Sequence, residues 1–140
     1  MNSLTNKLKF LFALMIIAMV TVSCSKITSM LDSENKLYFV ESYDGGKEKG
    51  KSDKFTTGSL TVMVDLRPKK QKIGVTDVDI NITDLGNNEV ISTNPYTVSP
   101  DMDYIFFNNV TFDKPGKYKV SCLKKDGTVV VSGVVEIVNK

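Results

Sequence analysis

The stretch FDKPGKYKVSCLKKDGTVVVSGVVEIV, residues 112–138, decides the fold class of this 140-residue chain. It opens with a turn at 113–116, where Pro and Gly stand as a type II turn favours. Tyr118 and Cys122 then share one face of a strand, since they are four residues apart. Asp126-Gly127 separates two apolar runs and is the strongest short hairpin signal. The segment therefore predicts paired antiparallel strands, the last of them central or well covered, with a bulge at Ser132-Gly133.

The same kind of pattern recurs through the preceding residues. In 59–66 the alternation is strict, so one face is expected in the core and the other, with Thr61, Met63 and Asp65, in solvent. Pro95 interrupts a short strand in the segment 89–98, which favours an edge position. The other strands are expected at 37–43, 75–83, 104–112, 117–124 and 129–138. The sequence thus predicts an all-β protein, an antiparallel β-sandwich of seven to eight strands.

The first 23 residues have the layout of a secretory signal peptide. Lys7 and Lys9 precede an unbroken apolar run, residues 10–22, and the small residue Ser23 stands just before Cys24. A membrane-spanning helix needs roughly 20 apolar residues, so this run is too short to cross a bilayer. We expect the segment to be cleaved from the mature protein.

Thr21-Val22-Ser23-Cys24 resembles a bacterial lipobox, with Thr21 in place of the usual Leu. The resemblance implies that lipid, including palmitate, is attached to Cys24 and that Cys24 becomes the first mature residue. Two or more acyl chains make a durable anchor where one does not. Ser25 directly after the cysteine resembles lipoproteins sent to the outer membrane. The alternative is a plain cleaved signal peptide with an incidental cysteine.

Three regions follow from these patterns. Residues 1–23 are the expected signal peptide, 24–36 a lipidated N-terminus and polar tether, and 37–140 the β-sandwich domain. As a flexible coil the tether would reach about 20 Å, and about 40 Å when fully stretched. The domain is therefore expected close to the membrane surface, on either its periplasmic or its outer side.

The segment FDKPGKYKVSC, residues 112–122, resembles the end of bacterial immunoglobulin-like, PKD and fibronectin-type domains. The resemblance implies an immunoglobulin-like sandwich and gives Tyr118 the role of their corner tyrosine, whose hydroxyl bonds back to the chain. The paired cysteines and core tryptophan of antibody domains are missing. A transthyretin-like or other two-sheet sandwich fits the same strand pattern.

The composition argues against catalysis, cofactors and nucleic acid. Histidine is absent, which removes the commonest general base and metal ligand. Residues 24–140 carry as many acidic as basic side chains, so no surplus of positive charge favours nucleic acid. The string DVDIN at 77–81 begins like a calcium loop, but Ile82 and Asn88 stand where that loop needs Gly and Glu. We expect no catalytic residue, no metal site and no cofactor.

Four further features have two interpretations each. Phe106 and Phe107 must point to opposite faces of a strand, so one needs cover from inside the domain or contacts a partner. Cys122 is expected in the core, the alternative being a reactive thiol. The charged segment 47–54 is expected to be a solvated loop, and the alternative is a patch that binds an acidic ligand. The segment 67–72 is expected to be an exposed turn, and the alternative is a contact with anionic lipid.

These observations predict a non-catalytic, lipid-anchored protein of the bacterial outer membrane. Its domain is expected to be a binding or adhesion module for an unidentified protein or glycan, with Phe106 and Phe107 as the candidate interface. The alternative is a structural component of an envelope assembly, similar to the small sandwich lipoproteins of secretion systems. The sequence alone does not decide between the two.

Overall fold

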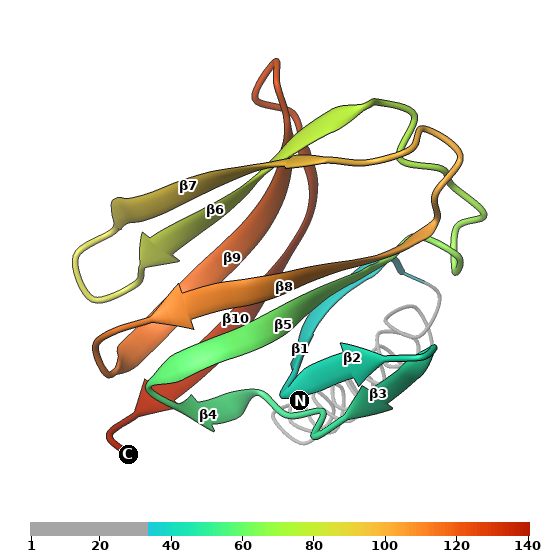
Figure 1. Cartoon of the computed structure of the whole chain (residues 1–140). Coiled ribbons are helices and arrows are strands. Elements are labelled where there is room, and N and C mark those ends of the chain that lie inside the picture. Colours follow the sequence, from blue (N-terminus) through green and yellow to red (C-terminus); the bar gives the residue numbers. More distant parts are fainter. Residues whose placement is uncertain (1–33) are drawn as a thin grey trace, which may run out of the picture. The chain divides into compact units, whose positions relative to one another are not determined.

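Two β-sheets packed face to face make up most of residues 34–140, the part of the chain that the computed structural model describes (Figure 1). The three-stranded sheet has the order β1-β5-β8, and the five-stranded sheet the order β4-β10-β9-β6-β7. The hairpin β2-β3 forms a third, separate sheet. The strands are β1 (Lys36–Val40), β2 (Ser42–Asp44), β3 (Lys47–Lys49), β4 (Lys54–Thr56), β5 (Gly58–Asp65), β6 (Asp77–Asp84), β7 (Glu89–Thr97), β8 (Tyr104–Phe112), β9 (Gly116–Lys124) and β10 (Val129–Val138).

The expected all-β sandwich is confirmed, but the described residues form ten strands and not seven or eight. The difference lies between residues 36 and 56: the strand expected at 37–43 is divided into β1 and β2, and the segment 47–54, expected to be a solvated loop, contains β3 and the first residue of β4. β3 completes a hairpin with β2. Gly45 and Gly46 both have positive φ (56° and 79°), as a two-residue type I′ turn requires. β4 also pairs in parallel with β10, whereas every other pairing among these strands is antiparallel.

The core lies between the two main sheets, and its side chains come from both. Residues 35–140 form one compact unit, which therefore contains its own core. The core side chains with less than a tenth of their surface exposed are Leu37, Phe39, Leu60, Val62, Val64, Leu66, Ile73, Val78, Ile80, Ile82, Val98, Ile105, Phe107, Val110, Phe112, Tyr118, Val120, Cys122, Val135 and Ile137. No helix among residues 34–140 has the length and apolar content needed to cross a membrane.

The corner expected at Tyr118 is present. Its hydroxyl donates a hydrogen bond of 2.7 Å to the carbonyl oxygen of Lys114, and its ring centroid lies 5.1 Å from that of Phe112. The bond joins the turn between β8 and β9 to the start of β9. This is the arrangement that the resemblance to immunoglobulin-like domains implied.

Cys122 is fully buried, as expected. Burial raises the pKa of its thiol to about 12. The reactive thiolate is therefore scarce at neutral pH.

The free edge at β7 also agrees with the expectation from Pro95, although β7 runs without a break through Asn94-Pro95. The bulge in β10 does not lie at Ser132-Gly133 as expected, since the register shifts between Val129 and Val131. Gly133 has another role, because β1 crosses close to it. A Cβ atom at Gly133 would lie 2.4 Å from the carbonyl oxygen of Leu37.

We predict that Gly133→Ala lowers the free energy of unfolding by roughly 1–3 kcal/mol, because the added methyl group meets backbone that must shift. Urea denaturation measures the change. The matched control is Val134→Ala, whose side chain is 53% exposed and which should have a much smaller effect. Equal effects of the two substitutions would contradict the close approach of β1 to β10.

Candidate functional site

The outer face of the three-stranded sheet, on the side away from the five-stranded sheet, carries a row of large side chains. Strand register places Tyr38 of β1 and Phe106 of β8 on either side of Met63 of β5. Met63 is fully buried, and Thr61 on the same face is 4% exposed. The expectation that these two residues face solvent is therefore wrong, because another element covers this face.

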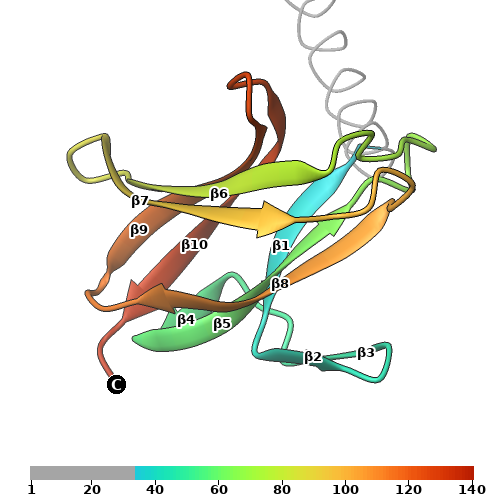
Figure 2. The same ribbon diagram turned by 45° about the horizontal axis from the view of Figure 1, so that its top comes forward.

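The hairpin β2-β3 provides the cover (Figure 2). Its Tyr43 ring lies 4.6 Å from the ring of Phe106 and 6.0 Å, edge to face, from that of Tyr104. We call Tyr38, Tyr43, Tyr104 and Phe106 the aromatic patch. Aromatic pairs at these distances stabilise beyond the area that they bury. The patch therefore holds a two-stranded hairpin that would be marginal by itself.

One carboxylate fastens the hairpin to the sheet. The hydroxyl groups of Tyr38 and Tyr104 both donate hydrogen bonds to Glu48 Oε1 on β3, and the two hydroxyl oxygens are 3.2 Å apart. Burial and the hydrogen bond to Glu48 raise the pKa of Tyr38 far above its ordinary value. The same two causes raise the pKa of Tyr104. Both phenols therefore stay protonated and keep donating.

Two cations lie over rings of the patch. The Arg67 guanidinium is 3.9 Å from the centroid of Tyr104, and Lys51 Nζ is 4.0 Å from that of Tyr38. Arg67 is held by Asp65 through two hydrogen bonds of 2.8 Å, and these bonds lower the pKa of the Asp65 carboxyl. The segment 47–54 and the turn 67–72, expected as separate solvated features, both contact Tyr104, through Glu48 and Arg67 respectively.

The structure separates the two phenylalanines of the candidate interface. Phe107 is 2% exposed and its ring packs against Tyr96 between the sheets, at 4.8 Å. A partner cannot reach it there, so the expectation for Phe107 is corrected. Phe106 points to the outer face, where the hairpin covers only part of it and 44% of its surface is exposed. The cover expected from inside the domain is therefore present but partial at Phe106. Contact of Phe106 with a partner stays a prediction.

The other expected site residues lie apart from the patch. Cys24 falls outside the described residues. Asp79, on the polar outer face of β6, forms a salt bridge of 2.6 Å with Lys125. Within residues 34–140, no three Cys, Asp or Glu side chains come together in a way that could hold a metal ion.

A cleft of about 630 Å³ lies where β4 and the start of β5 meet the end of β10. Its lining combines charged, small polar and apolar side chains, among them Glu41, Lys51, Lys54, Phe55, Leu60 and Val138. Glu41 is the one acidic side chain lining this cleft, so no pair of carboxylates converges there for acid–base chemistry. The cleft offers hydrogen bonds and positive charge to a ligand.

No family model matches the chain, and no curated protein matches it significantly.

We predict that Glu48→Ala loosens the hairpin without unfolding the sandwich. Backbone amides of 42–49 should exchange with deuterium several-fold faster, because both hydroxyl bonds to the carboxylate are lost. Global stability should fall by no more than about 1 kcal/mol, since Glu48 is exposed. The control is Lys47→Ala on the same strand. Unchanged exchange in the Glu48 variant would mean that the carboxylate does not hold the hairpin.

We also predict that the protein becomes less stable as the pH rises above about 10, the ordinary pKa of tyrosine. The native state keeps protons on Tyr38 and Tyr104 that the unfolded chain releases, so the free energy of unfolding falls in this range. Tyrosinate absorbance should appear at higher pH in the native protein than in urea. Tyr38→Phe should reduce the pH dependence of stability. Superimposable titrations of the native and unfolded protein would contradict the buried hydroxyl network.

Proposed function

We propose that this protein is a non-catalytic binding module, anchored by lipid on Cys24 in the bacterial outer membrane, that contacts its partner through the aromatic patch. The proposal combines the lipobox-like sequence at residues 21–24 with the outer face of the three-stranded sheet. It assigns no reaction, because the patch carboxylate Glu48 is already engaged by two hydroxyl groups.

The partial exposure of Phe106 against Tyr43 is the observation that carries the proposal. The core between the sheets does not use these two rings. Aromatic side chains at a surface supply much of the binding energy in protein interfaces when charged groups form the rim around them. Lys51 and Arg67 lie over neighbouring rings and provide such groups. A protein segment or a glycan with flat apolar faces fits this chemistry.

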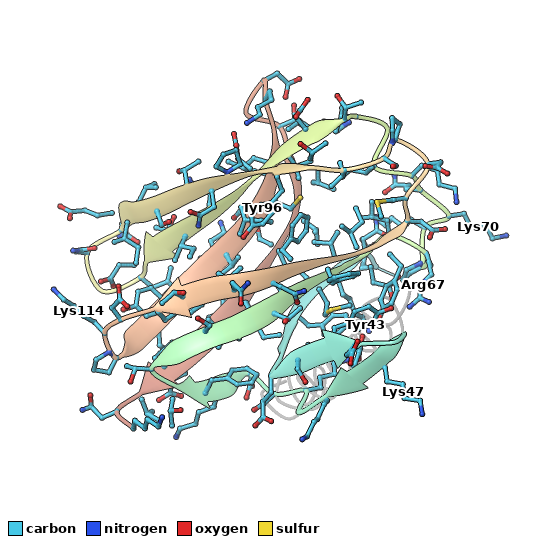
Figure 3. The ribbon with its side chains drawn as sticks, viewed as in Figure 1. Tyr43, Lys47, Arg67, Lys70, Tyr96 and Lys114 are labelled. Atoms are coloured by element: carbon cyan, nitrogen blue, oxygen red, sulfur yellow. The ribbon has the colours of Figure 1, made fainter. Side chains whose placement is uncertain are left out.

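The point where the chain enters the domain is compatible with an anchor. The Asn35 side chain donates a hydrogen bond of 2.5 Å to Gln71 and accepts one of 3.3 Å from the backbone N–H of Lys69. The chain therefore enters the sandwich at the turn that carries Lys70, while Lys114 lies at the opposite end (Figure 3).

We predict that a benzophenone-bearing phenylalanine analogue in place of Phe106 forms a covalent adduct with the partner when cells are irradiated. The reason is that position 106 would lie within the contact. The same analogue in place of Val134 is the control, since Val134 is 53% exposed on the other sheet. Adducts are detected as a shift in the electrophoretic mobility of the protein.

An adduct at position 106 and not at 134 would support the patch as the binding surface. No adduct at 106, or the same adducts at both positions, would contradict it. If the partner is an envelope protein of the same cell, the alternative role in an envelope assembly gains support.

We predict that the protein incorporates labelled palmitate and that Cys24→Ala abolishes the labelling. The control is Cys122→Ala, since Cys122 is the other cysteine of the chain and is fully buried. Labelling is read from the immunoprecipitated protein. Labelling that survives in the Cys24 variant, or an unlabelled wild-type protein, would contradict the anchor without bearing on the aromatic patch.

A further inference from the structure

A groove of about 280 Å³ lies beside the aromatic patch, between the base of the β2-β3 hairpin and the outer face of the three-stranded sheet. Glu41, Ser42 and Tyr43 line the groove on the side of the hairpin. The residues that line it on the side of the sheet are Ser59, Leu60, Thr61, Asn108 and Asn109. Tyr43 belongs to both the patch and the groove, so a molecule that fills the groove also touches the patch.

A β-bulge brings two amide side chains to the groove. The register between β5 and β8 shifts at Thr61, where Asn108 and Asn109 both lie opposite this single residue. Adjacent residues of a regular strand point to opposite faces, whereas the two asparagines are both exposed and both line the groove. Asn109 has a φ of 60°, a left-handed backbone that asparagine adopts more readily than most residues. Bulges near functional sites re-aim side chains in this way.

Hydroxyl groups hold both asparagines in place. Thr61, only 4% exposed, donates a hydrogen bond of 2.8 Å to Asn108 Oδ1, which leaves the Asn108 NH₂ group to donate to a ligand. The Thr111 hydroxyl donates a long hydrogen bond of 3.5 Å to the Asn109 carbonyl oxygen and is itself hydrogen-bonded to Ser59, at 2.9 Å. The groove is therefore preorganised, and a ligand orders few side chains when it binds.

We propose that this groove binds an uncharged sugar ring of a glycan. The apolar face of the ring packs against Tyr43 and the exposed part of Phe106. Its hydroxyl groups bond to the amides of Asn108 and Asn109 and to the carboxylate of Glu41, which accepts strong hydrogen bonds. The inference rests on the proposed function, because Tyr43 and Phe106 belong to the aromatic patch. It names a glycan, and not a protein segment, as the partner.

The chemistry of the lining favours an uncharged sugar over other ligands. Glu41 is the only charged side chain that lines the groove, so an anionic ligand would meet repulsion there and no cation. A peptide strand adds to the edge of a sheet, whereas this groove lies over the central strand β5. The side chains that anchor protein interfaces fill desolvated pockets, but the exposed lining here is rich in hydroxyl and amide groups. A sugar ring combines apolar faces with hydroxyl groups that both donate and accept.

The size of the groove suits a single sugar ring. Its volume of about 280 Å³ lies just below the usual range of ligand sites, about 300–1,000 Å³. The groove shares Glu41 and Ser59 with the cleft of about 630 Å³ at the end of β10. A longer glycan can therefore continue from the groove into the cleft.

The experiment uses ¹⁵N-labelled residues 34–140, which contain the compact unit and its core. Neutral disaccharides of glucose, galactose, mannose and N-acetylglucosamine are added to about 20 mM, where even a millimolar affinity is visible. At least one disaccharide should shift the backbone amide resonances of 41–43 and 106–109 in a saturable manner. Glucuronic acid is the charged comparison and should bind more weakly, since Glu41 repels its carboxylate.

A variant that keeps the backbone tests the role of the bulge. Asn109→Gly should weaken binding of the disaccharide roughly two- to tenfold, because glycine adopts the same positive φ but lacks the amide. Asn87→Ala, which removes an amide from the turn between β6 and β7, is the matched control and should leave the affinity unchanged. Thermal unfolding of both variants establishes that each is folded.

Three results would overturn the inference: no saturable shift with any neutral disaccharide, binding of glucuronic acid alone, or unchanged affinity in the folded Asn109→Gly variant. The photo-crosslinking at position 106 separates this failure from that of the proposed function. A protein adduct at 106 without sugar binding would support the patch as a binding surface and exclude a glycan as its partner. Neither an adduct nor sugar binding would contradict both.

Discussion

Burial of β5 on both faces is the constraint on which the rest of the structure depends. Val62 and Val64 face the core between the sheets, and Met63 on the other face is equally inaccessible to water. A strand of an antiparallel sandwich commonly has one solvated face, so the second face of β5 needs a separate cover. The hairpin β2-β3 is that cover, and it can stay in place only if something fastens it.

The contacts that hold the hairpin on the sheet leave part of the aromatic surface exposed. Glu48 binds both hydroxyl groups on the sheet, and Tyr43 rests on Tyr104 and Phe106. Because the hairpin has only two short strands, it cannot enclose every ring that it touches, and Phe106 remains 44% exposed. The same contacts that bury Met63 therefore create the surface that we propose for binding.

Much of the sandwich could be predicted because its signals are local. Residue spacing placed Tyr118 and Cys122 of β9 on one face, both of which are buried, and Asp126-Gly127 marked the hairpin between β9 and β10. The resemblance of residues 112–122 to the end of immunoglobulin-like domains implied the hydrogen bond from the Tyr118 hydroxyl to the chain, which the structure shows. Pro95 indicated an edge, since a missing N–H is tolerated there.

The candidate site could not be predicted in the same way, because its contacts are distant in sequence. Glu48 and Tyr104 are 56 residues apart, and the lysine-rich segment around Glu48 has the composition of a solvated loop. Alternation correctly set Phe106 and Phe107 on opposite faces but held no information on which face was better covered. Two features of the sequence were available as signals of this site. Gly45-Gly46 indicated the turn of the hairpin, and Met63, an apolar residue at a position expected to face outward, indicated that the outer face is covered.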